Sequence, residues 1–183
     1  MPGPTAPTKV DGDGLRSRER RTTMLAEVGL GLSVVLAGLW SGLLLAVVTL
    51  LHPMYAALDG GEFAVELQRF LPVARKSPTN WVSVIGLVVF PVLALVGLAG
   101  DPTGAPFVLT ALGLVCTVAG PLLVSRLLAE PNYAVILGWD PAAMPPGWDA
   151  VRRRYFLWNR VRGAFTWVAF GLFLAAAYAH LSR

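Results

Sequence analysis

The run VGLGLSVVLAGLWSGLLLAVVTLL, residues 28–51, contains no charged side chain. An α-helix rises about 1.5 Å per residue, so about 20 apolar residues cross the hydrocarbon core of a bilayer. Three further uncharged runs follow, at 81–99, 106–125 and 163–181. A chain of 183 residues has too few other residues to cover four apolar helices, so lipid must cover them. The sequence therefore predicts four transmembrane helices.

The composition agrees with a membrane protein. Hydrophobic residues make up 55% of the chain and charged residues 14%, whereas soluble domains carry about 25% charged residues. One cysteine and two histidines leave too few ligands for a disulfide framework or for a metal or haem site, so we expect no metal and no cofactor. The net charge of +4 does not indicate nucleic acid as a partner, because the arginines cluster beside the apolar runs.

The chain divides into a tail and one membrane domain. Residues 1–23 are rich in polar residues, proline and glycine and are predicted to form a disordered tail, followed by the transmembrane domain at 24–183. Four arginines precede the first apolar run: Arg16, Arg18, Arg20 and Arg21. They favour a cytoplasmic N-terminus for a multi-pass protein of the cell membrane. The sequence is compatible with a homo-oligomer.

The first connection contains an amphipathic segment. Residues 62–71 place Phe63, Leu67, Phe70 and Leu71 at helical spacing, and the charged residues of this segment fall on the other side. This pattern predicts a helix that lies at the membrane interface or covers the end of the bundle.

The ends of the later helices are also marked. Ser77-Pro78 has the pattern of an N-cap followed by proline at the first helical position. The turn at 101–104 joins the second and third runs in an antiparallel hairpin. Residues 131–147 are expected to be irregular, and a helical pattern resumes at Asp149 and continues into the fourth run. The prediction is an all-α, antiparallel four-helix transmembrane bundle with an interfacial helix between its first two helices.

Alternating helix directions bring most polar residues near the spans to one end of the bundle. These residues are His52, Tyr55, Asn80, Trp81, Arg126, Tyr155, Trp158, Asn159 and Arg162. The last four share one face of a helix. Trp158 also suits an aromatic belt and Arg126 a contact with lipid headgroups, but a buried Asn159 and Arg162 need polar partners. None of the four runs contains an acidic residue, which disfavours an ion-coupled permease.

Three motifs resemble the anthrone-oxygenase-like family of small four-helix membrane proteins, a family of largely unknown function. They are the residues 41–46 leading to His52-Pro53-Met54-Tyr55, the Gln68-Arg69-Phe70 helix followed by Asn80, and Trp148…Tyr155…Trp158-Asn159-x-x-Arg162. The leucines after Pro121 depart from the asparagine that many members carry there. The resemblance implies a four-helix membrane fold. Characterised members oxidise anthrones to anthraquinones without a metal or flavin.

Two functions fit these residues. The first is a cofactor-independent, oxygenase-like enzyme for an apolar phenolic, anthrone or quinone-type molecule. In this hypothesis His52 accepts a proton and Arg162 with Asn159 stabilises the enolate oxygen. The residues that would bind the substrate are Tyr55, Asn80, Arg126, Tyr155 and Trp158. The second is a non-catalytic bundle that binds lipid or quinone, or is a subunit of a larger complex, with the polar residues joining its helix ends.

Overall fold

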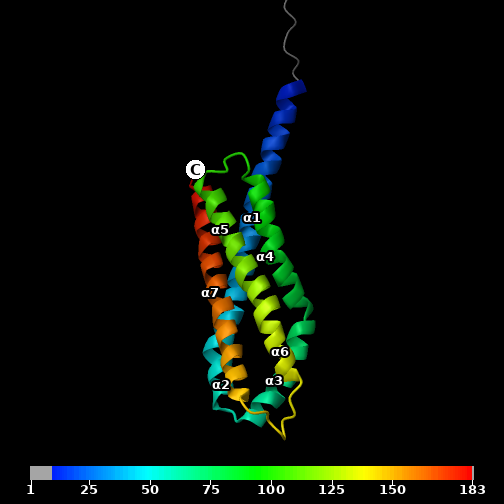
Figure 1. Cartoon of the computed structure of the whole chain (residues 1–183). Helices are drawn as coiled ribbons and strands as arrows, with labels where there is room; N and C mark the ends of the chain where they lie inside the picture. The colour runs from blue at the N-terminus through cyan, green and yellow to red at the C-terminus, as the bar shows by residue number, and fades with distance from the viewer. Residues whose placement is uncertain (1–9, 183) are drawn as a thin grey trace, which may run out of the picture.

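The computed structural model describes residues 10–182, and every regular element in this range is a helix. Several helices are continuous with the next. Their bounds are α1 (Val10–Ala46), the π-helical η1 (Val47–Leu51), α2 (His52–Ala57), α3 (Gly60–Lys76), α4 (Pro78–Gly97), α5 (Ala105–Thr117), the π-helical η2 (Val118–Ala129), α6 (Glu130–Leu137) and α7 (Trp148–Leu181). Successive long helices run in opposite directions, with the α4–α5 turn and the end of α7 at the top of Figure 1 and α2 and α3 at the bottom. The chain is therefore an all-α bundle, as predicted.

Four helical segments are long and apolar enough to cross a membrane. They are Gly14–Ala57, Pro78–Gly97, Ala105–Leu137 and Trp148–Leu181. Their outer surfaces carry exposed large apolar side chains, such as Leu39, Val115 and Val168. A surface of this kind suits contact with lipid and not with water. By length and composition, the chain is built as a multi-pass membrane protein.

Small residues allow the helices to approach closely. The helix α1 packs mainly against α4 and α7, and α5 packs mainly against α7. A β-carbon at Gly29 would lie 2.5 Å from the backbone nitrogen of Ala94, and one at Gly97 would lie 2.4 Å from that of Ala26. The α1–α4 crossing is therefore a backbone-to-backbone contact, of the kind that small residues permit in membrane helices.

Two helices extend beyond the predicted boundaries. The expected tail at 1–23 is helical from Val10 onward, and residues 1–9 lie outside the described residues. Once a helix exists, each added residue gains one hydrogen bond, so α1 continues through the arginine-rich segment. The third helix continues through Glu130–Leu137, where an irregular segment was expected. Pro131 is the second residue of α6, directly after the π-helical turns of η2, and these wider turns make room for its ring.

Both π-helical segments lie beside prolines. The segment η1 ends two residues before Pro53, and η2 contains Pro121 and ends two residues before Pro131. Proline removes a backbone donor and clashes with the carbonyl of residue i−4, and a wider turn relieves both effects. Because π turns rotate the side chains that follow them, the direction of Arg126 on η2 does not follow from α-helical spacing.

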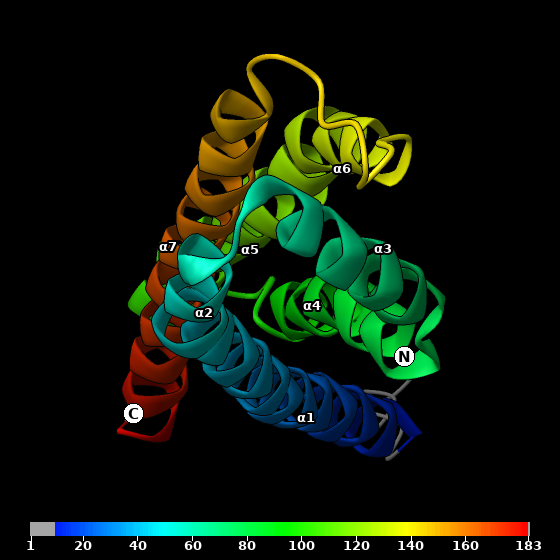
Figure 2. The same cartoon turned by 90° about the horizontal axis from the view of Figure 1, so that it is seen from below.

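The helix α3 covers the lower end of the bundle. Figure 2 shows it crossing this end beside α4 and α6, and contacts with both helices agree. Its buried face includes Phe63, Leu67 and Leu71, so the predicted amphipathic helix is confirmed. Phe70 differs from the prediction because its side chain is partly exposed. The side chain of Gln68 donates a hydrogen bond to the carbonyl of Trp139 at 2.8 Å and attaches α3 to the loop after α6.

Arg152 joins the start of α7 to the segment between α2 and α3. Its Nη1 donates to the carbonyl of Leu58 at 3.0 Å, and its Nη2 lies 2.8 Å from the carboxylate of Asp149. The guanidinium also lies 4.6 Å from the ring centroid of Trp148, within the range of a cation–π contact. These contacts hold α3 over the bundle end.

We expect Arg152→Ala to lower the midpoint of thermal unfolding in detergent by roughly 5 °C, because it removes a hydrogen bond, an ion pair and a cation–π contact. Differential scanning fluorimetry measures this change. The matched control is Arg154→Ala, because Arg154 is exposed on the same helix. Equal midpoints for the two variants would show that Arg152 does not stabilise this end.

Candidate functional site

Two adjoining cavities lie at the end of the bundle that α3 covers. The outer cavity, of about 230 Å³, is lined by Trp40, Arg75, Asn80, Trp81, Val84, Pro121, Leu122, Ser125, Arg126, Glu130 and Arg162. The inner cavity, of about 120 Å³, adds Tyr133, Tyr155, Asn159 and apolar residues of α1, η1 and α3. Both are lined by Trp40, Arg75, Asn80, Glu130 and Arg162. The predicted convergence of polar residues at one end of the bundle is present in the structure.

Arg162 is the central cation of this site. Its Nη2 donates to Oδ1 of Asn159 at 2.7 Å, and its Nη1 donates to the hydroxyl of Ser125 at 3.3 Å. Tyr133 donates to the same Asn159 oxygen at 3.5 Å. Because arginine can only donate, the amide oxygen of Asn159 must face it and the amide nitrogen must point elsewhere. None of the ion pairs among the described residues involves Arg162.

Three N–H donors of the site lack an acceptor among the described residues. They are Nε1 of Trp40, Nδ2 of Asn159 and Nε of Arg162, and all three atoms are buried. Trp40 is 7% exposed and Asn159 is 2% exposed, and both line the inner cavity. A buried donor without a partner is costly and rare in native proteins. The site therefore suits a molecule that presents hydrogen-bond acceptors.

Glu130 is the only carboxylate lining either cavity, within the part of the chain that is described. Its Oε2 lies 2.6 Å from Nη2 of Arg75, and this ion pair joins the end of α3 to the start of α6. The predicted third span ended at residue 125, so it did not include Glu130, and no predicted span contained an acidic residue. The continuous helix reaches Leu137, so the absence of an acidic residue in the spans no longer argues against a permease.

The structure brings five of the eight predicted site residues to the cavities. These are Asn80, Arg126, Tyr155, Asn159 and Arg162. His52, Tyr55 and Trp158 line neither cavity. Tyr55 and Trp158 instead belong to, or pack against, a buried cluster that includes Tyr155.

His52 is buried away from the cavities. It is 3% exposed, and its ring centroid lies 4.6 Å from that of Phe156 and 5.9 Å from that of Tyr155. Both ring nitrogens are buried without a hydrogen-bond partner among the described residues. Tyr155 lines the inner cavity, so His52 packs beside a residue of the site but does not line the cavity.

Sequence reasoning missed three residues that line both cavities: Trp40, Arg75 and Glu130. Trp40 lies within the first apolar run, where an aromatic residue has the pattern of ordinary packing. Glu130 follows Arg126 by four residues and therefore lies near it on a helical surface. This spacing could have predicted Glu130 as a site residue, but only if the third helix was expected to continue past residue 125.

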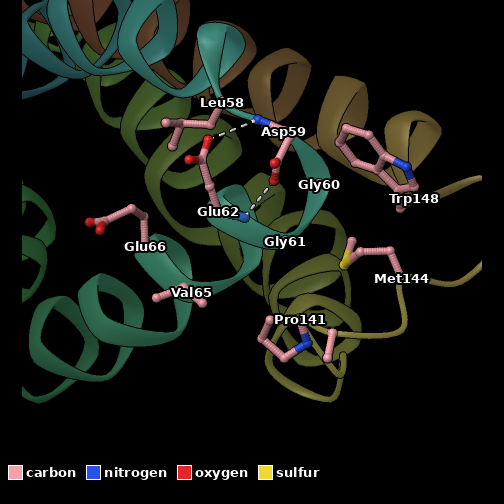
Figure 3. A pocket seen from close by; sticks show the side chains of 11 residues that line it. Leu58, Asp59, Gly60, Gly61, Glu62, Val65, Glu66, Pro141, Met144 and Trp148 are labelled. Carbon is pink, nitrogen blue, oxygen red and sulfur yellow. Dashed lines mark hydrogen bonds between the residues drawn. The ribbon is translucent and has the colours of Figure 1, made fainter.

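A third cavity, of about 740 Å³, lies at the surface between the start of α3 and the loop before α7. Figure 3 shows Asp59, Glu62, Met144 and Trp148 around it. Asp59 and Glu62 form the capping box of α3, with hydrogen bonds of 2.8 and 3.3 Å. These two carboxylates are thus engaged in starting the helix, and no predicted site residue lines this groove.

Among the described residues, no three histidine, cysteine, aspartate or glutamate side chains group closely enough to hold a metal ion. The candidate site consists of amides, guanidinium groups, one carboxylate, indoles and phenols around two small cavities. No family model, no curated protein and no solved structure matches this chain.

Proposed function

We propose that this multi-pass membrane protein binds an apolar aromatic molecule, of phenolic, anthrone or quinone type, through the oxygen of that molecule. The observation that carries the proposal is the set of three buried N–H donors without an acceptor, on Trp40, Asn159 and Arg162. A carbonyl, phenolate or enolate oxygen accepts such hydrogen bonds. The rings of Trp40 and Tyr155 supply aromatic surface beside these donors.

The oxygenase-like reaction is supported in part by the same geometry. Arg162 and Asn159, which would stabilise a developing negative charge on oxygen, line the inner cavity together. His52, the expected proton acceptor, lies outside it. We therefore propose binding of the aromatic molecule as the primary function. Its oxidation, which the resemblance to the anthrone-oxygenase-like family suggests, is the secondary proposal.

The binding proposal predicts a specific effect of one indole N–H. We expect Trp40→Phe to weaken binding of 2-methyl-1,4-naphthoquinone about fivefold, because it removes one neutral donor and keeps an aromatic ring. Equilibrium dialysis of the purified protein in detergent measures the affinity. Trp158→Phe is the matched control, because Trp158 lines neither cavity. Absence of binding to the unmodified protein, or an equal loss in both variants, would contradict the proposal.

The reaction has its own experiment. We expect the unmodified protein to accelerate oxygen uptake from a solution of anthrone under air, and Arg162→Ala to abolish the acceleration. His52→Ala tests whether the buried histidine takes part in spite of its position. Oxygen uptake that neither substitution alters would remove the enzymatic hypothesis and leave a non-catalytic binding protein.

A further inference from the structure

We infer that the outer cavity is a binding site for a phosphate ester, a group carried by membrane lipids and by soluble metabolites alike. This inference shares Trp40 and Arg162 with the proposed function, but it rests on Arg126, which lines the outer cavity alone, and not on Asn159, which lines the inner cavity alone. It rests on the charge of the outer cavity, on its donors and on its position between two membrane-facing helices.

The charge of the outer cavity is unbalanced. Arg75, Arg126, Glu130 and Arg162 line it. Arg75 and Glu130 form an ion pair of 2.6 Å and neutralise each other. Neither Arg126 nor Arg162 belongs to an ion pair among the described residues. Arg126 can offer its planar fork of donors to a phosphate. Arg162, whose two Nη atoms already donate to Asn159 and Ser125, adds a second positive charge without a carboxylate partner beside the same cavity.

Further donors surround the same space. Nε of Arg162 and Nε1 of Trp40 are buried without an acceptor among the described residues, and both side chains line the outer cavity. Asn80, in the first turn of α4, lines it as well. The N-cap residue Ser77 makes no side-chain cap hydrogen bond, so the positive end of the α4 dipole is not offset by a side-chain cap. This end of a helix attracts anions.

The surroundings of the cavity suit an amphiphile. Arg126 is exposed on η2, and Trp81 is 59% exposed at the start of α4. Toward the middle of the bundle, Ile85 on α4 and Leu123 on η2 are exposed apolar residues. A lipid headgroup therefore reaches the cations from the membrane interface, while its acyl chains lie along apolar helix surfaces. Tryptophan at this level is typical of the interface.

The test compares three probes on the purified protein in a neutral detergent. They are dioleoyl phosphatidylglycerol, dioleoyl phosphatidylcholine and glycerol 3-phosphate, and native mass spectrometry measures the bound fraction. We expect phosphatidylglycerol to bind more tightly than phosphatidylcholine, whose choline the arginines repel. Arg126→Gln should weaken phosphatidylglycerol binding about tenfold, because it removes charge-assisted hydrogen bonds. Arg126→Lys should restore part of the loss.

The matched control is Arg69→Gln, because Arg69 is exposed on α3 and lines neither cavity. Binding of glycerol 3-phosphate as tightly as the lipid, with the same loss in Arg126→Gln, would support a site for a soluble phosphate. Equal binding of every probe by the Arg126→Gln and Arg69→Gln variants would overturn the inference. Binding of phosphatidylglycerol without binding of 2-methyl-1,4-naphthoquinone would refute the proposed function alone, and the reverse result would refute this inference alone.

Discussion

Replacing Arg162 by methionine is expected to weaken naphthoquinone binding by roughly 10- to 100-fold, because hydrogen bonds to charged donors contribute about 1.5–3 kcal/mol. Methionine keeps much of the length of the side chain and removes the guanidinium. Its loss also frees the oxygen of Asn159, which now accepts from Arg162 at 2.7 Å, so the amide is no longer held in one orientation. Equilibrium dialysis of the purified protein measures the affinity.

The control for this substitution is Arg160→Met, since Arg160 is exposed on the same helix. Thermal unfolding without ligand separates the two functions that fit the sequence. If the polar cluster is a binding site, Arg162→Met keeps a midpoint within a few degrees of the unmodified protein. If the cluster only joins helix ends, Arg162→Met and Asn159→Ala lower the midpoint sharply, whether or not a quinone is present.

The second large effect is expected at the α1–α4 crossing. Gly97→Leu should lower the unfolding midpoint in detergent by roughly 10 °C. A β-carbon at residue 97 would lie 2.4 Å from the backbone nitrogen of Ala26 and 2.6 Å from the carbonyl oxygen of Thr22. Backbone atoms cannot rotate away as a flexible side chain can, so the two helices must separate and lose contacts along their length.

The matched control is Gly31→Leu, because a β-carbon at Gly31 meets no atom within 4 Å and the residue is exposed. Gly31 lies on α1, one partner of the same crossing, so both substitutions add the same apolar side chain to this helix pair. Differential scanning fluorimetry compares the two variants. Equal midpoints would show that the close approach of α1 and α4 does not contribute to stability.

The hydrophobicity of the sequence predicted where the helices lie, but it did not predict where all of them end. The run at 163–181 and the helical pattern from Asp149 predicted α7 to within one residue of its start at Trp148. In contrast, Pro131 suggested an irregular segment, and the structure continues the helix to Leu137. The local sequence around Pro131 is compatible with two outcomes: the helix before it can end, or it can continue through a wider π-helical turn. The choice depends on packing against α3 and α7.

The candidate site was predicted in the same uneven way. Tyr155, Asn159 and Arg162 share a face of α7 because of their spacing alone, and all three line the inner cavity. His52 has the chemistry of a catalytic base, but it is buried against Phe156 and Tyr155. Chemical type identified candidate residues, whereas only packing decided which of them face a shared space.

The amino-acid sequence alone determined that this chain forms apolar helices long enough for a membrane and that its polar residues gather at one end. The first property depends on local composition and on helix length, which a sequence displays directly, and the second follows from the alternating directions of successive helices. The tertiary structure alone decided that Arg75 pairs with Glu130 and that Trp40 faces the same cavities as Arg162. These contacts join segments far apart in the chain, and they depend on π turns and close helix crossings that no single segment encodes.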